Sequence, residues 1–338
     1  METLRTFSLR RARVWAPAAA ILCSMGLAAR DAAQASASRH TAGTNGLILF
    51  QAHVGSYNQL FTIKPDGSGL TQVTKIPFTG DTDGAEQADW SPDGKTIAFD
   101  APSRRGGDTF INLFTVAPDG SGLAELPLAL LGFNGAPAYS PDGSKIAFDQ
   151  DVGPSHPNVH GIFVANADGS EPRRLVTGLA TPDSYDTNTD WSPDGTRITF
   201  TRVKNQREAA IFVVRADGRG LKRLTPWRLD AANADWSPDG SKLIFHSYYN
   251  EQPGKSPNIF TMRPDGGKMT PLTHFTGGDT QGLGPSWSPD GTKIVWHKVT
   301  PKLNELFVMD AHGGHLRKLT NLPLDANPSR ADWGTAAA

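Results

Sequence analysis

The phrase Trp90-Ser91-Pro92-Asp93-Gly94 decides the fold of this chain, because it returns at regular intervals. Its copies begin at Trp90, Tyr139, Trp191, Trp236 and Trp287. A broken sixth copy reads Ala331-Asp332-Trp333-Gly334. Successive aromatic residues are 49, 52, 45, 51 and 46 positions apart. A period of this length indicates a chain built from one repeated supersecondary unit.

Two further phrases alternate with the first. One is a β-branched and aromatic run that precedes a turn, as in residues 113–116 before Asp119-Gly120. The other is a short run after that turn, as in residues 123–126. Each unit therefore holds four short runs of strand-forming residues, and the turns between them contain Asp-Gly, in which Gly accepts a positive φ. Four antiparallel strands within such a period are the signature of a β-propeller blade.

The order of the runs predicts how a ring of blades would close. The chain enters the repeat at the second run of a unit, residues 46–50, and leaves at the first run of another, residues 330–333. Pairing these two ends would complete a blade and cover strand edges that an open array exposes. We therefore predict an all-β fold, a six-bladed β-propeller of four-stranded antiparallel blades, closed by pairing the C-terminal strand with the N-terminal blade.

The Trp-Ser-Pro-Asp-Gly repeats, followed by runs such as Ile97-Ala98-Phe99 or Ile294-Val295-Trp296, resemble those of the TolB-type six-bladed β-propeller family. The resemblance covers residues 46–334 and implies architecture more than function. TolB itself has a separate N-terminal domain that contacts inner-membrane partners. Here the repeat is preceded by residues 36–45, a Ser/Ala/Thr-rich stretch that we expect to be a disordered linker, so that domain is expected to be lacking.

The first 35 residues predict export. Four arginines between positions 5 and 13 precede an uncharged apolar stretch, residues 14–29, and Ala33-Gln34-Ala35 offers a cleavage pattern before Ser36. This is the layout of a secretory signal peptide, and the apolar stretch is short for a spanning helix. We predict a signal peptide over residues 1–35, a propeller over 46–334 and a tail over 335–338. The expected location is periplasmic or secreted, by Sec or Tat, without a membrane span after cleavage; an uncleaved anchor is the alternative.

The composition excludes several classes of function. Lys and Arg number 33 and Asp and Glu number 34, so no broad basic surface is available and nucleic acid is not an expected partner. The single cysteine, Cys23, excludes a disulfide scaffold and a cysteine zinc site. The sequence also contains no Gly-x-Ser-x-Gly elbow and no His-Glu-x-x-His motif.

The predicted propeller has two unlike faces. Short, nearly identical turns would lie on one, the turn face, and longer loops of varied length on the other, the variable face. Binding residues commonly lie on variable loops held by a rigid scaffold. Aromatic side chains in these loops are candidate ligand contacts, with loop packing as the alternative. They are Tyr185, Trp227, Tyr248 and Tyr249.

Carboxylates precede the aromatic residue in four of the six units. We call Asp89, Asp190, Asp235 and Asp332 the aspartate ring. Asp is disfavoured inside strands, so these residues require a reason. They are candidate ligands for a divalent cation, calcium or magnesium, or for the end of a peptide or oligosaccharide. The alternative is that they accept backbone N–H groups of the neighbouring blade. Arg330 is a candidate to neutralise their charge.

A polar collar is predicted beside this ring. Pairing across the Ser-Pro-Asp-Gly turn would place Asp100 opposite Gln87 and Phe99 opposite Ala88. The positions equivalent to Asp100 are mostly polar around the ring. The candidate ligand-binding residues among them are Gln51, Asp100, Asp149, His246 and His297.

The sequence favours an exported, non-catalytic, monomeric binding module. Its expected partner is a protein, a peptide or a cell-envelope glycan, bound by the variable face and the channel mouth. The alternative is a metal-dependent polysaccharide lyase or another channel-based propeller enzyme. Oligogalacturonate lyases resemble this chain in repeat style and use a His/Gln metal site, for which His246, His297 and Gln51 are the comparable trio. No clear base is present, and no catalytic residue is assigned.

Overall fold

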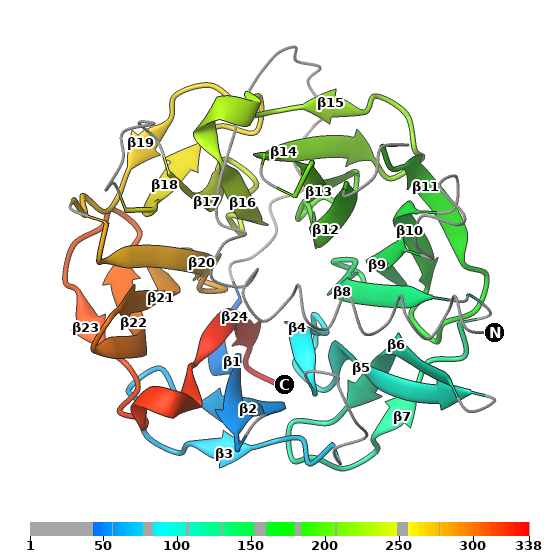
Figure 1. The fold of residues 1–338 in the computed structure, drawn as a ribbon, viewed down its shortest axis with the longest axis horizontal. Helices are drawn as coiled ribbons and strands as arrows, with labels where there is room; N and C mark the ends of the chain where they lie inside the picture. Colours follow the sequence, from blue (N-terminus) through cyan, green and yellow to red (C-terminus); the bar gives the residue numbers. More distant parts are fainter. Residues whose placement is uncertain are drawn as a thin grey trace.

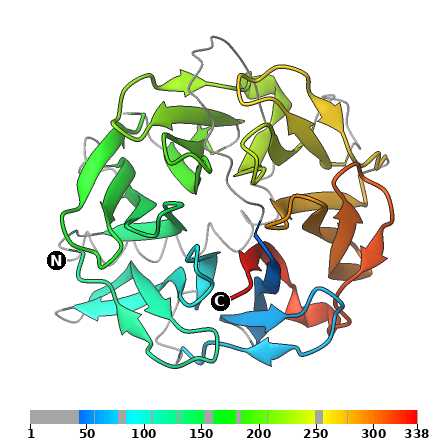
Figure 2. The same ribbon diagram turned by 180° about the vertical axis from the view of Figure 1, so that it is seen from behind.

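The chain forms an all-β propeller of antiparallel four-stranded blades arranged around a central axis (Figures 1 and 2). The computed structural model describes residues 43–55, 57–76, 84–105, 108–128, 130, 132–151, 160–179, 184–206, 208–248, 256–276 and 278–337. The predicted signal peptide lies outside these residues, as do residues 36–42 of the predicted linker. Within the described part of the chain, no helix has the length and hydrophobicity needed to cross a membrane.

Each blade places its strands from the channel outward in the order of the sequence (Figure 1). The innermost strands are β4 (Glu86–Trp90), β8 (Phe133–Tyr139), β12 (Tyr185–Trp191), β16 (Ala231–Trp236), β20 (Gln281–Trp287) and β24 (Ser329–Thr335). The second strands are β1 (Asn45–Val54), β5 (Ile97–Arg105), β9 (Lys145–Asp151), β13 (Arg197–Lys204), β17 (Leu243–Ser247) and β21 (Lys293–Thr300).

The two outer positions complete the blades. The third strands are β2 (Tyr57–Ile63), β6 (Asp108–Val116), β10 (Gly161–Asn166), β14 (Glu208–Arg215), β18 (Asn258–Met262) and β22 (Leu303–Asp310). The outermost strands are short: β3 (Thr71–Gln72), β7 (Ala124–Glu125), β11 (Arg173–Thr177), β15 (Lys222–Arg223), β19 (Thr270–Pro271) and β23 (Arg317–Lys318). Two 3-10 turns, η1 (Trp227–Leu229) and η2 (Leu324–Ala326), precede β16 and β24.

Hydrogen bonding divides the described strands into four sheets of four strands and one of eight. The larger sheet contains the sets β4–β7 and β8–β11, which are joined through one parallel pair, Ile111 with Phe133. The sheet at the chain ends has the order β24-β1-β2-β3. The C-terminal strand therefore pairs with the N-terminal one, antiparallel, with Trp333 opposite Ile48.

The repeated phrase forms a self-contained turn between the first and second strands. The Ser91 hydroxyl donates to the Asp93 carboxylate over 2.7 Å and accepts the Thr96 N–H over 2.9 Å. Gly94 has a φ of +68°, which a glycine adopts without strain. Hydrogen bonds from the Ser91 hydroxyl and the Lys95 N–H hold the pKa of the Asp93 carboxyl below its usual value. The phrase is therefore explained by turn chemistry, as expected.

The predicted register is wrong at the end of the hairpin farthest from the turn. Asp89 lies opposite Ala98, as expected, but Glu86 rather than Gln87 lies opposite Asp100. The reason is a β-bulge between Glu86 and Asp89, where one strand contains an extra residue. Each innermost strand has such a bulge, and three positions before the aromatic each has a residue with positive φ. We call these six residues the bulge ring: Gln87, Ala136, Asn188, Asn233, Gly284 and Arg330.

Removing β24 should destabilise the whole ring. Trp333 is buried against Ile48 and Phe50, and a Trp-to-Ala truncation in such a core costs about 3 to 5 kcal/mol. The deletion also opens the edge of β1, which invites association. A chain ending at residue 328 should lose several degrees of melting temperature and form oligomers in light scattering. A control chain ending at residue 336 should behave like the full one; a monomeric, equally stable deletion would contradict the role of β24.

Candidate functional site

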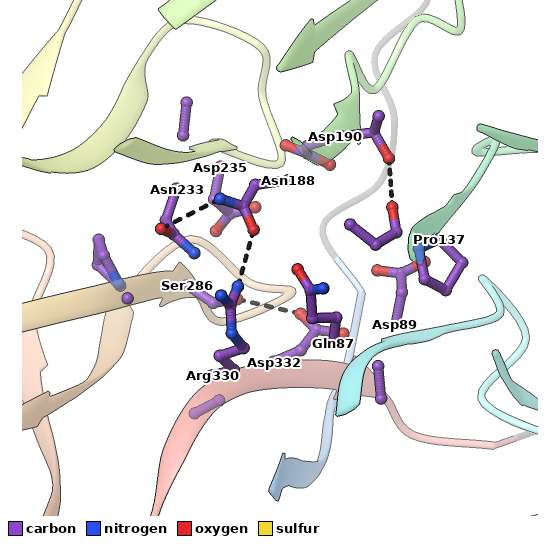
Figure 3. Close-up of a pocket in the computed structure, with 17 residues that line it drawn as sticks. Gln87, Asp89, Pro137, Asn188, Asp190, Asn233, Asp235, Ser286, Arg330 and Asp332 are labelled. Carbon is purple, nitrogen blue, oxygen red and sulfur yellow. Dashed lines mark hydrogen bonds between the residues drawn. The ribbon is translucent and has the colours of Figure 1, made fainter. Parts of the chain in front are cut away.

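The innermost strands enclose a polar cavity of about 120 Å³ in the channel (Figure 3). All four aspartates of the ring and all six members of the bulge ring line it. Along each strand the bulge residue comes two positions before the ring position, and the turn follows the aromatic. The bulge ring therefore lies toward the variable face and the aspartate ring lies deeper.

Every aspartate of the ring accepts a hydrogen bond from a backbone N–H of the neighbouring innermost strand. The bonds run from Tyr139 to Asp89 (2.7 Å), Trp236 to Asp190 (2.7 Å), Trp287 to Asp235 (2.6 Å) and Trp90 to Asp332 (3.2 Å). The alternative to a ligand role, that these aspartates accept backbone N–H groups of the neighbouring blade, is therefore observed. One carboxylate oxygen of each aspartate connects two neighbouring blades, and the side chains meet around the channel.

The buried carboxylates have raised pKa values. Burial is the largest cause for Asp190, and the charge of Asp235 adds to it. Burial, followed by the charge of Asp332, likewise raises the pKa of Asp89 well above its usual value. Burial raises the pKa of Asp235 to about 8, although the Trp287 N–H opposes this. Burial therefore favours the protonated forms of these carboxyl groups, and Asp235 holds its proton at neutral pH.

The predicted divalent cation stays a prediction. Among the described residues, no group of three or more His, Cys, Asp or Glu side chains could hold a metal ion. Calcium favours six to eight oxygen ligands, whereas each aspartate here commits one oxygen to a backbone N–H. The expected neutraliser, Arg330, forms no ion pair with the ring in the described part of the chain. Its guanidinium donates instead to the Asn188 side-chain oxygen over 2.7 Å.

The polar collar also joins blades. Gln51 accepts the N–H of Gln87 over 3.0 Å, and Asp100 accepts that of Ala136 over 3.1 Å. His246 accepts the Gly284 N–H through Nδ1 over 3.3 Å. Side chains of second strands thus satisfy backbone groups that the bulges of the next blade leave free. Asp149 occupies the same position on β9 and is buried.

The two histidines of the collar are neutral. Both side chains are buried, and burial lowers the pKa of each to about 3, with a further contribution from the charge of Arg330. Because Nδ1 of His246 accepts a hydrogen bond, its proton is on Nε2. His246, His297 and Gln51 lie at one level on successive blades, but Gln51 is engaged by Gln87.

The predicted aromatic contacts are dispersed, and those that the structure describes do not line the channel cavity. Tyr185 begins β12 and Tyr248 follows β17. Trp227 begins η1, where the Lys204 ammonium lies 4.9 Å from its ring centroid. Tyr249 lies outside the described residues. The predicted set therefore separates into a channel group and a peripheral group.

Sequence reasoning missed two features. The first is the bulge ring, for which Asn at two positions and Gly at a third were a usable signal of left-handed backbone. The second is a buried ion pair in which Arg202 contacts both oxygens of Asp186, each over 2.6 Å. Burial raises the pKa of Asp186, although Arg202 opposes it. Asp186 on β12 lies directly opposite Arg202 on β13, because the bulge shifts the register of the two strands by one residue.

The aspartate ring should make stability fall as pH rises. A carboxyl whose folded pKa exceeds its unfolded value of 3.8 stabilises the fold fully below that value, and the contribution is lost as pH rises through the folded pKa, about 8 for Asp235. Between pH 5 and 8.5 we expect the free energy of unfolding to decrease by about 1 to 3 kcal/mol, measured by urea denaturation.

The variant Asp190→Asn with Asp235→Asn should flatten this pH dependence. Each amide keeps an oxygen that can accept the backbone N–H but has no charge to bury, so the variant should melt above wild type at pH 8.5. Asp194→Asn, in an exposed turn where hydrogen bonds from Ser192 and Thr196 lower the pKa, should keep the wild-type slope. Equal slopes for the double variant and wild type would contradict this explanation.

Residues 190–336 match the family description "TolB beta propeller domain". The chain resembles the crystal structure of TolB from Acinetobacter baumannii, with a TM-score of 0.65 and 19% identity, over 86% of this chain and 66% of that one. A putative TolB from Agrobacterium tumefaciens gives a TM-score of 0.62 and 20% identity over 86% of this chain and 99% of that one.

A curated relative, Dipeptidyl-peptidase 5 of Arthroderma otae, is 28% identical over 158 residues, which are 42% of this chain. The match spans 20% of the length of that relative. Both TolB structures are under 25% identical, so they establish the fold alone. The repeats, the fold and the match over residues 190–336 together support the TolB-type β-propeller family for this chain.

Proposed function

We propose that this chain is an exported binding protein whose ring has six blades. The eight-stranded sheet would count as two blades, because its two four-stranded sets meet at a single residue pair. The β24–β1 pairing would complete the sixth. Residues 1–35 would act as a signal peptide, residues 46–334 as the propeller, and the mature chain would work as a monomer outside the cytoplasm.

The observation that carries the binding role is the polar channel mouth. The six bulge residues, five of which have side chains, line a cavity of about 120 Å³ on the side of the variable loops. Bulges re-aim side chains in this way beside binding sites. The turn face, by contrast, repeats one hydrogen-bonded turn with little variation. We infer that a protein, a peptide or a cell-envelope glycan contacts the variable face and reaches the mouth.

A peptide is the partner that the comparisons favour. The relative from Arthroderma otae is named a dipeptidyl-peptidase, and this chain contains no Gly-x-Ser-x-Gly motif. We therefore propose peptide binding without cleavage. The lyase alternative would use His246 and His297, and the proximity of the Arg330 charge to both disfavours a cation between them.

Capture from a cell-envelope extract tests the binding role. The immobilised chain should retain a partner, and Trp227→Ala and Tyr248→Ala on the variable face should weaken retention about tenfold. Leu123→Ala, an exposed residue of the turn face, is the matched control and should retain it fully. Loss of retention in the control but not in the two variants would place the binding surface on the wrong face.

Turnover assays test the enzyme alternative. We expect the purified chain to release no product from chromogenic dipeptides or from uronic-acid polymers, with or without calcium, magnesium or manganese. Metal-dependent turnover that disappears in His297→Ala would overturn the non-catalytic assignment. A chelator-induced decrease of the melting temperature, reversed by calcium, would instead support a cation in the aspartate ring.

A further inference from the structure

We propose that the channel mouth binds a carboxylate group, which the guanidinium of Arg330 and the side-chain amide of Asn233 hold. This inference deepens the proposed binding role and rests on it. The ligand would be the free acidic end of a chain, inserted from the variable face. Its source would be a peptide carboxyl terminus or the uronate of a glycan, which offer the same planar anion.

Within the described residues, Arg330 is a cation without an anionic partner. Its guanidinium lines the cavity with four carboxyl groups, yet in the described part of the chain it forms one hydrogen bond, to the neutral Asn188 side chain. A guanidinium has five N–H donors in a fork that matches a carboxylate. Figure 3 shows Arg330 extending from β24 toward Asn188 across the channel. The remaining donors are therefore available to a ligand.

The bulge ring as a whole favours an anion. Its members are three amides, one alanine, one glycine and one arginine, so it contains a cation and no acid. Asn188 donates through its amide nitrogen to the Asn233 oxygen over 3.4 Å, which leaves the Asn233 nitrogen without an acceptor among the described residues. A group entering from the variable face thus meets N–H donors before it reaches the aspartates.

The groups around Arg330 do not cancel its charge. Burial raises the pKa values of Asp89, Asp190 and Asp235, which favours the uncharged forms of these carboxyl groups. Burial keeps His246 and His297 neutral. These shifts reduce the negative charge that faces the Arg330 guanidinium.

The size of the cavity restricts the ligand to an end group. A volume of about 120 Å³ corresponds to about four water molecules, which fits a carboxylate with its adjoining carbon but not a folded segment. Gly284 lines the mouth without adding a side chain to it, and a Cβ there would lie 3.3 Å from the His297 Nδ1 atom. Ala136 presents only a methyl group on another blade.

Titration calorimetry with matched probes tests the inference. N-acetyl-triglycine with a free carboxylate should bind at least about tenfold more tightly than its carboxamide, or glucuronate should bind at least about tenfold more tightly than glucose. Preference in the first pair identifies a peptide terminus as the source, and preference in the second identifies a uronate. Equal binding within both pairs would overturn the proposal.

Two variants locate the site. Arg330→Gln keeps an N–H donor for Asn188 but removes the charge, so it should weaken binding of the acidic probe at least about tenfold. Asn188→Asp should weaken it equally, because the new carboxylate would occupy the guanidinium from within, and Asp tolerates the left-handed backbone at this position. Arg317→Gln, on the turn face, is the control and should bind like wild type. Wild-type binding by a folded Asn188→Asp chain would sink the proposal, even if Arg330→Gln fails to fold.

Capture experiments separate this inference from the binding role. A partner retained equally by wild type, Arg330→Gln and Asn188→Asp would leave the binding role intact and refute carboxylate recognition. Carboxylate probes that bind through Arg330, together with an envelope extract that yields no partner, would support the carboxylate site and refute the proposed role.

Discussion

The structure depends on one repeated contact, the hydrogen bond that the backbone N–H of an aromatic residue on one innermost strand donates to an aspartate on another. Its four copies are 2.6 to 3.2 Å long, and the four aspartate side chains that accept them are buried. The contact connects strands that no sheet ladder joins, so it fixes how the blades lie around the axis. It also brings four carboxyl groups together around the channel, each from a different innermost strand.

Because of that contact, the same four aspartates both join neighbouring blades and line the channel. Burying a carboxylate is costly unless it is paired or protonated, and the raised pKa values indicate that protonation is part of the solution. The ring departs from full symmetry at two positions, Ala138 and Ser286, and Ser286 donates its hydroxyl to Asp332 over 3.1 Å. A neutral donor at that position satisfies the adjacent carboxyl group without adding charge. The aspartates are thus largely used by the fold.

The sequence was sufficient for the strand order and the turns, because these depend on local chemistry that each unit repeats. Ser91, Asp93 and Gly94 close their turn with contacts among themselves and their immediate neighbours, so the phrase predicts the hairpin. The bulge was not predicted, since Gln87 and Ala136 carry no left-handed signal and only comparison with the equivalent Asn and Gly positions indicates one. The roles of the collar residues were not predicted either. Gln51 and Asp100 accept hydrogen bonds from the neighbouring blade, and the rules for pairing strands within a hairpin do not describe contacts between blades.

The chemistry left for a ligand follows from which donors and acceptors the fold has already used. The aspartates each commit an oxygen between blades, and the described collar acceptors satisfy the backbone N–H groups at bulges. Among the described residues, Arg330 commits a single N–H donor to a neutral amide, and its backbone adopts a left-handed φ of +48° that L residues rarely take. Arg330 lies on β24, the strand that pairs the chain ends. It is the charged member of the bulge ring, and its guanidinium also has hydrogen-bond donors that the described residues do not use. Recognition should therefore begin at the bulge ring rather than at the aspartate ring.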